Sequence, residues 1–120
     1  MYESLPIDRW AREVEQATRL AQEFADAVRA RLGPRVTRIV LFGSVVRGEW
    51  SPDSDIDVLV LLDTVDSNDV GLVVRLATRL GVLGKGLLIQ PVILPEEEFE
   101  HLKRRERRFA LEVERTGKTL

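Results

Sequence analysis

The chain has 120 residues, of which 44% are hydrophobic, and this size suits one compact domain with a core of its own and leaves no room for two. It has no cysteine, no apolar run near the roughly 20 residues that a bilayer requires, and no signal-peptide pattern, so we expect a cytoplasmic protein without a membrane partner. Its 20 acidic and 18 basic residues nearly cancel to a net charge of -2, which argues against nucleic acid and favours a small substrate or protein partner.

The first predicted element is a long amphipathic helix over residues 6–32. Apolar side chains recur along it at alternating spacings of three and four, which places them on one face of the helix. Gly33 and Pro34 end it, because glycine favours the position after a helix and proline cannot continue one. The apolar face comprises Ile7, Trp10, Val14, Ala17, Ala21, Phe24 and Val28.

Two strands and the loop between them follow. Residues 36–42 and 56–62 are short aliphatic and β-branched runs, which predict buried strands. The sequence between them, GSVVRGEWSPDSD at residues 43–55, is too polar and too rich in turn-forming residues for a regular element. We therefore expect the chemistry of the protein in this loop.

A second helix is expected after this pair of strands. Three residues offer caps at its start, and Gly81 or Gly84 ends it. The caps are Asp66, Ser67 and Asn68, and the predicted apolar side comprises Val70, Val73, Val74, Ala77 and Leu80.

The last part of the chain completes an α/β pattern. A third strand is predicted at residues 87–94 and a C-terminal helix at 95–116, with the residues after 116 frayed. The order of elements predicts a single two-layer α/β domain over residues 1–120, in which residues 36–94 form the core.

The turn after the first strand is suited to a phosphate group. Gly43 can take a backbone conformation closed to other residues, which lets a phosphate approach the main chain. If residues 44–47 form a short helical turn, the free amides at its start favour an anion through hydrogen bonds and the helix dipole, and Ser44 adds a hydroxyl. Arg47 can add a charge-assisted fork.

A pair of carboxylates lies at the entry to the second strand. Asp55 and Asp57 are two residues apart, so both side chains leave the same face of the sheet. Two adjacent acids repel unless a cation neutralises them, and Mg²⁺ prefers a few carboxylates completed by phosphate oxygens and water. A phosphate cradle and a metal pair one loop apart indicate phosphoryl or nucleotidyl transfer.

The stretch GSVVRGEWSPDSDIDVLV resembles the signature of the DNA polymerase beta nucleotidyltransferase superfamily, especially its minimal nucleotidyltransferase branch. The direct match covers residues 41–60, about a sixth of the chain. The resemblance implies a mixed sheet of three or more strands, flanked by about four helices in an α+β fold. It also implies catalysis with a nucleoside triphosphate and two Mg²⁺ ions, the triphosphate held by Gly43, Ser44 and Arg47 and the metal by the catalytic pair Asp55 and Asp57.

One position departs from the superfamily pattern. Active members usually carry a third carboxylate on a later strand, where this chain has LLIQPVIL and the nearest equivalent is Gln90. An amide cannot act as a base and is a poor Mg²⁺ ligand beside carboxylates.

The first functional hypothesis is an enzyme that transfers AMP from ATP to a hydroxyl group. So small a domain leaves little chain for a substrate pocket, so a partner or a homodimer mate is expected to supply one. Minimal nucleotidyltransferases are commonly paired with a small helical HEPN protein as toxin and antitoxin. The resemblance therefore implies a HEPN-type partner, with one of its tyrosines as the acceptor and this chain as the antitoxin.

Two other functions stay open. Gln90 favours a binding module that neutralises its partner by complex formation alone. A drug-modifying aminoglycoside nucleotidyltransferase resembles the same motif, but normally needs an additional helical domain that this chain lacks.

Overall fold

The computed structural model describes the backbone of residues 6–120 and the side chains from Arg9 onward. Ile7 was expected on the buried face of the first helix, but its side chain is not among those that the structure describes. The elements in chain order are α1 (Pro6–Leu32), a 3-10 turn (Gly33–Arg35), β1 (Val36–Phe42), α2 (Ser44–Arg47), β2 (Ile56–Leu62), α3 (Ser67–Leu80), α4 (Val82–Lys85), β3 (Ile89–Pro95), α5 (Glu96–Arg104), α6 (Arg108–Thr116) and β4 (Lys118–Thr119). No helix within residues 6–120 is both long and apolar enough to cross a membrane.

The strands form one mixed sheet in the order β3-β2-β1-β4. β2 runs antiparallel to β1 and parallel to β3, and β4 pairs antiparallel with the other side of β1. The loop at residues 43–55 joins the antiparallel pair, whereas the parallel pair needs a crossover, which α3 supplies. The mixed sheet with flanking helices confirms the expected fold class.

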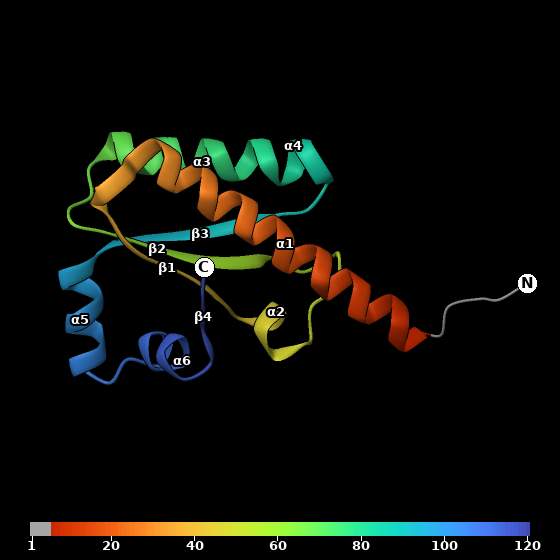
Figure 1. Cartoon of the computed structure of the whole chain (residues 1–120). Helices are drawn as coiled ribbons and strands as arrows, with labels where there is room; N and C mark the ends of the chain where they lie inside the picture. The colour runs from red at the N-terminus through yellow and green to blue at the C-terminus, as the bar shows by residue number, and fades with distance from the viewer. Residues whose placement is uncertain (1–5) are drawn as a thin grey trace, which may run out of the picture.

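α1 and α3 cover one face of the sheet (Figure 1). Alternate residues of β2, among them Ile56 and Val58, are fully buried in the same core as Phe24 and Val28 of α1. The N-terminal part of α1 projects beyond the sheet (Figure 1), and Trp10, expected on the buried helix face, is instead 43% exposed. The apolar stripe of α1 is therefore longer than the sheet that it covers.

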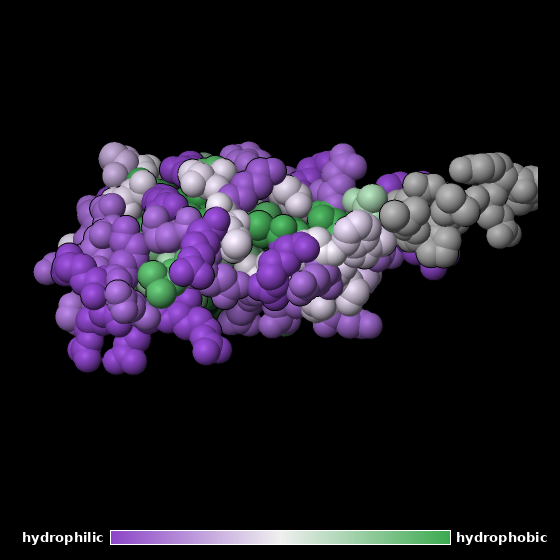
Figure 2. Space-filling view, turned by 90° about the horizontal axis from the view of Figure 1, so that it is seen from below, coloured by the Kyte–Doolittle hydropathy of each residue, from purple (hydrophilic) through white to green (hydrophobic). Residues whose placement is uncertain are grey.

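α5 and α6 cover the opposite face (Figure 1). Leu59 and Leu61 of β2 pack there against Phe99 and Val113, in a second, smaller core. The helices thus lie on both faces, one layer more than the two-layer arrangement predicted, because β2 is apolar on both faces and each face needs cover. The surface on this side of the molecule is largely hydrophilic, with apolar side chains only in small patches (Figure 2).

The C-terminal helix predicted at residues 95–116 is two helices. α5 ends at Arg104 and α6 begins at Arg108, with Glu106 between them at a φ of 54°. The run KRRERR places like charges within one helical turn, which disfavours a continuous helix. The turn lets α6 fold back across the sheet, so that Ala110 and Val113 are fully buried.

The end of the chain is ordered rather than frayed. β4 pairs Thr119 with Val40 and Lys118 with Leu41, and the Leu120 amide donates to the Ile39 carbonyl at 2.9 Å. The sequence KTL carries no strand signal of its own, so this pairing depends on β1 having a free edge.

α3 begins as predicted and buries only part of its predicted apolar side. Asp66 is its N-cap and forms a capping box with Asp69. Val73 and Ala77 are buried, whereas Val70 and Val74 are 40% and 45% exposed. The buried stripe of α3 is therefore narrower than its apolar pattern.

Candidate active site

The turn after β1 has the backbone that the sequence predicts. Gly43 has φ 80° and ψ -150°, a region that residues with a side chain rarely adopt. α2 follows at once, and Gly48 ends it in the left-handed conformation. Ser44 is the first residue of α2, where a helix leaves amides without an intrahelical acceptor. The local conditions for an anion site are thus present.

Gly43 is pressed against the carboxylate of Asp57. A Cβ built on Gly43 would collide with Oδ2 of Asp57 and lie 3.2 Å from its Cγ. The two residues meet because the end of β1 pairs with the start of β2, where Phe42 is the register partner of Asp57. The absent side chain of Gly43 therefore makes room for the carboxylate beside the turn.

Asp55 and Asp57 form an acidic pair at this end of the sheet. Asp55 is exposed just before β2, and Asp57 is half-buried on the face that α5 and α6 cover. Burial raises the pKa of Asp57; the charges of Asp55 and Glu112 raise it further, and Arg47 lowers it. A negative charge on Asp57 is thus unfavourable in the protein alone, and a bound cation would stabilise it.

The next strand presents an amide rather than an acid to this pair. Gln90 of β3 is the register partner of Asp57, which places it on the adjoining strand as the sequence pattern indicates. Over the described part of the chain, no group of three or more His, Asp or Glu side chains is placed to hold a metal ion. Two carboxylates still fit a Mg²⁺ ion that is completed by phosphate oxygens and water.

Arg47 lies at the end of α2 and is engaged by two acids. Its Nε donates to Glu49 Oε2 at 3.1 Å, and its Nη1 donates to Glu112 Oε1 of α6 at 2.6 Å. The hydrogen bond to Glu49, together with the charges of Glu49, Glu112 and Asp57, raises the pKa of Arg47. The guanidinium is therefore held by Glu49 and Glu112, within electrostatic reach of Asp57.

The loop between the turn and the acidic pair is anchored by Trp50. Its side chain is 1% exposed, and its Nε1 donates to the Ser54 carbonyl at 3.0 Å. Trp50 therefore packs inside the loop and is not available to stack on a base. On the outer side, the Trp10 ring lies against Gly48, where a Cβ would be 3.2 Å from it.

A surface hollow of about 450 Å³ lies beside this site rather than over it. It is lined by the turn before α6 and by α6, and Glu112 is the residue that it shares with the surroundings of Arg47. Neither Asp55 nor Asp57 lines this hollow.

Comparison with known proteins decides the family. Residues 21–114 match the nucleotidyltransferase domain family. The chain belongs to this family. Two relatives of this nucleotidyltransferase come from Methanocaldococcus jannaschii and are named "Putative protein adenylyltransferase", MJ0604 and MJ0141. The first is 36% identical over 78 residues, covering 65% of this chain and 73% of the relative. The second is 31% identical over 75 residues, covering 62% and 75%. These relatives support the minimal nucleotidyltransferase branch.

Solved structures share the fold of this nucleotidyltransferase. A toxin-antitoxin structure with AMP-PNP is 24% identical with a TM-score of 0.54, covering 81% of this chain and 69% of the solved one. A mutant of the toxin-antitoxin MntA-HpeT is 23% identical with a TM-score of 0.53, and the match covers 79% of this chain and 68% of the solved one. At these identities the likeness supports the fold, and the mixed sheet agrees with it.

The site of this nucleotidyltransferase thus combines predicted and unpredicted residues. The structure brings Gly43, Ser44, Arg47, Asp55 and Asp57 to one end of the sheet. The carboxylate of Glu112, 65 residues beyond Arg47 in the sequence, was not predicted there. Glu112 lies in a helix of mixed charges, and no spacing rule connects it to the loop.

Proposed function

We propose that this nucleotidyltransferase transfers AMP from ATP to a hydroxyl group and releases pyrophosphate. The contact between Gly43 and Asp57 carries the proposal. It joins the turn at Gly43 and Ser44, here called the phosphate turn, and the acidic pair into one site. The family membership and the relatives named as protein adenylyltransferases support this reaction.

Each residue has a role that follows from its place. The turn at Gly43 and Ser44 would bind the triphosphate through main-chain amides and the Ser44 hydroxyl. Asp55 and Asp57 would hold Mg²⁺, which when bound neutralises phosphate charge and orients the phosphorus that the hydroxyl attacks. Arg47 would bind a phosphate oxygen through a charge-assisted hydrogen bond.

The acceptor that we propose is a tyrosine on a small helical HEPN-type partner, with this chain as the antitoxin. Solved structures of the same fold include toxin-antitoxin proteins, one of them with AMP-PNP. A tyrosine hydroxyl supplied by a partner also fits an acidic pair that lies open at the surface.

Label transfer tests this proposal. The purified protein would be incubated with Mg²⁺, ATP labelled on the α-phosphate and the protein encoded beside it, and the partner examined for label. We expect transfer by the wild type and none by Asp55→Asn/Asp57→Asn. Asp53→Asn is the matched control, because Asp53 lies exposed in the same loop and should leave transfer unchanged.

A second function has one observation in its favour, namely Gln90 opposite Asp57 where an acid would complete the site. In that case the domain neutralises its partner by binding alone. A stable complex with no label transfer would establish this function and exclude the enzymatic one.

A further inference from the structure

The guanidinium of Arg47 is held from two directions by acids on different elements. Glu49 bonds Nε at 3.1 Å from the loop after α2, and Glu112 bonds Nη1 at 2.6 Å from α6. Neither bond uses Nη2. The two carboxylates thus define the orientation of the guanidinium and leave Nη2 available to a ligand.

Glu112 lies next to Arg47 because α6, the helix that carries it, is packed against the sheet. Ala110 and Val113, its neighbours on α6, are fully buried against the sheet. The Glu112 side chain stays 35% exposed and that of Arg47 43% exposed, so the bond lies at the surface of the site. A long arginine side chain that is this exposed is free to sample many rotamers unless a partner holds it.

We propose that Glu112 is a positioning residue for nucleotide binding: it holds the Arg47 guanidinium on the side of Asp57, the carboxylate that adjoins the turn at Gly43, before the triphosphate arrives. This inference rests on the proposed function of the turn at Gly43. Glu112 touches neither nucleotide nor metal in this role and acts through Arg47. Its benefit is preorganisation, because the rotamer freedom of Arg47 is lost in folding rather than in binding.

Simple charge predicts the opposite effect. Glu112 is close enough to raise the pKa of Asp57, so its negative charge also opposes a negative triphosphate. Removing that charge without any positioning role would tighten binding. Loss of a positioning residue would weaken it, so the two roles differ in sign.

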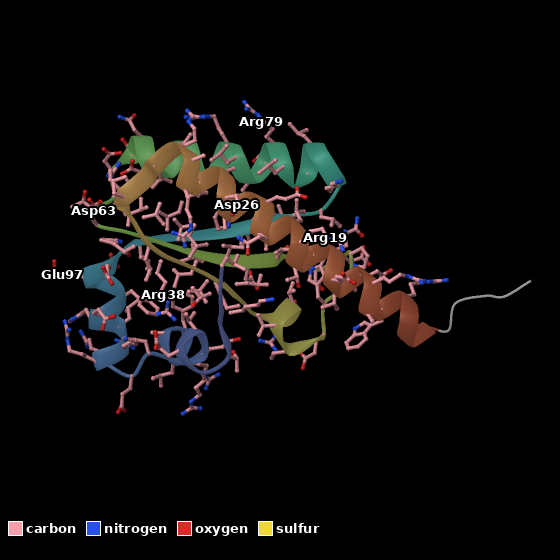
Figure 3. All side chains as sticks on the ribbon, viewed as in Figure 1. Arg19, Asp26, Arg38, Asp63, Arg79 and Glu97 are labelled. Carbon is pink, nitrogen blue, oxygen red and sulfur yellow. The ribbon has the colours of Figure 1, made fainter. Side chains whose placement is uncertain are left out.

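The helix offers a matched control in Glu114. Its Oε1 accepts from Nη1 of Arg38 at 2.7 Å, and its side chain is also 35% exposed. Arg38 lies on β1, reaching toward α6 (Figure 3), and its bond is on the same helix but does not include Arg47. Glu114→Gln therefore reports what an ion pair of α6 contributes without a role in the site.

The test is the affinity for Mg·ATP, measured by titration calorimetry on the full chain. We expect Glu112→Gln to weaken binding by about two- to fivefold, the range for one exposed ion pair, and Glu114→Gln to leave it unchanged. In an Arg47→Gln background, Glu112→Gln should have no further effect, because the residue through which it acts is gone.

Each other result has a definite meaning. Tighter or equal binding by Glu112→Gln would overturn the positioning role. An undiminished loss in the Arg47→Gln background, with a higher Mg²⁺ requirement, would overturn it in favour of Glu112 as a metal ligand. Equal losses of Mg·ATP affinity in Glu112→Gln and Glu114→Gln would overturn the positioning role, because both ion pairs would then act only by supporting the position of α6. Failure of the wild type to bind Mg·ATP would overturn the nucleotide site itself, and this inference with it.

Discussion

At the scale of single residues, Gly43 is constrained both by its own backbone conformation and by the neighbouring Asp57. Its φ of 80° is closed to other residues, and any Cβ would meet the Asp57 carboxylate. We expect Gly43→Ala to abolish Mg·ATP binding in calorimetry and to lower the free energy of unfolding by about 1–3 kcal/mol.

Gly33→Ala separates the effect of backbone strain from the effect of the clash with the Asp57 carboxylate. Gly33 also has a positive φ, of 57°, but a Cβ there would meet nothing within 4 Å. It should lower stability by about 1 kcal/mol and leave nucleotide affinity intact. Normal binding by Gly43→Ala would contradict the role of the turn.

Asp57 should make the metal-free protein less stable. Its pKa is raised in the folded state, so the ionised carboxylate is unfavourable there relative to the unfolded chain. At pH 7, Asp57→Asn should raise the melting temperature by up to about 2 °C in EDTA while removing Mg·ATP binding.

The pH dependence of the melting temperature tests whether the Asp57 carboxylate destabilises the fold. The advantage of Asp57→Asn should disappear as the pH falls and the wild-type carboxyl becomes protonated in both states. Thermal unfolding from pH 7 to pH 3 measures it, with Asp53→Asn as the control. A lower melting temperature for Asp57→Asn at pH 7 would show that Asp57 supports the fold instead.

The residue chemistry of the turn and the acidic pair could be predicted because it is local. Gly43, Ser44, Asp55 and Asp57 lie within fifteen residues, and period-two alternation puts the acids on one face. The bond from Arg47 to Glu112 could not, because it spans 65 residues and depends on how α6 packs.

At the scale of elements, the first turn of α3 contains the most buried ion pair of the described fold. Asp69 is 4% exposed, caps the helix with Asp66 and accepts from both Nη1 and Nη2 of Arg35 at 2.8 and 2.7 Å. The bond from Arg35 lowers the pKa of Asp69 to about 2. This pair connects α3 to the 3-10 turn that precedes β1.

Asp69→Asn should therefore destabilise the fold by about 1–3 kcal/mol at pH 7, because a charged, bidentate bond is lost from a buried position. A depressed folded pKa stabilises above the unfolded pKa, so the deficit of the variant should shrink from about pH 4 and vanish near pH 2. Urea unfolding at several pH values measures it.

Glu15→Gln is the control for this series, since Glu15 pairs with Arg19 on the exposed face of α1 at 68% exposure. It should change stability little at any pH. A deficit of Asp69→Asn that stays constant down to pH 3 would contradict the linkage.

Strong local signals explain which elements were predicted. α1, β1 and β2 follow from long runs with one clear period, and α3 from its cap. The break at Glu106 has only the weak signal of the charge run KRRERR, and the strand β4 has none, since it exists because α6 returns the chain to the sheet. Tertiary packing decided them.

At the scale of the whole molecule, the two helical layers explain why the site lies where it does. The layer of α1 and α3 buries one face of the sheet, whereas α5 and α6 cover the other and leave the end near Asp57 half-buried. The phosphate turn, the acidic pair and Arg47 all lie at that end of the sheet. The layers, unlike the motif, depend on long-range contacts that the sequence pattern leaves undetermined.

Ligand binding at this end should stabilise the entire fold. A ligand that binds only the folded state at 100 times its dissociation constant adds about 2.7 kcal/mol. For a domain of this size, we expect Mg·ATP at that excess to raise the melting temperature by about 10 °C. EDTA should remove most of the rise, because the acidic pair then faces the triphosphate without a cation.

The acidic pair predicts which variants respond. Asp55→Asn/Asp57→Asn should show almost no rise with Mg·ATP, whereas Asp53→Asn, altered in the same loop, should respond like the wild type. A full rise in the double variant would place the nucleotide elsewhere on the molecule. A full rise in EDTA would mean that the turn and Arg47 hold the triphosphate without the metal, and the carboxylates would then serve transfer rather than binding.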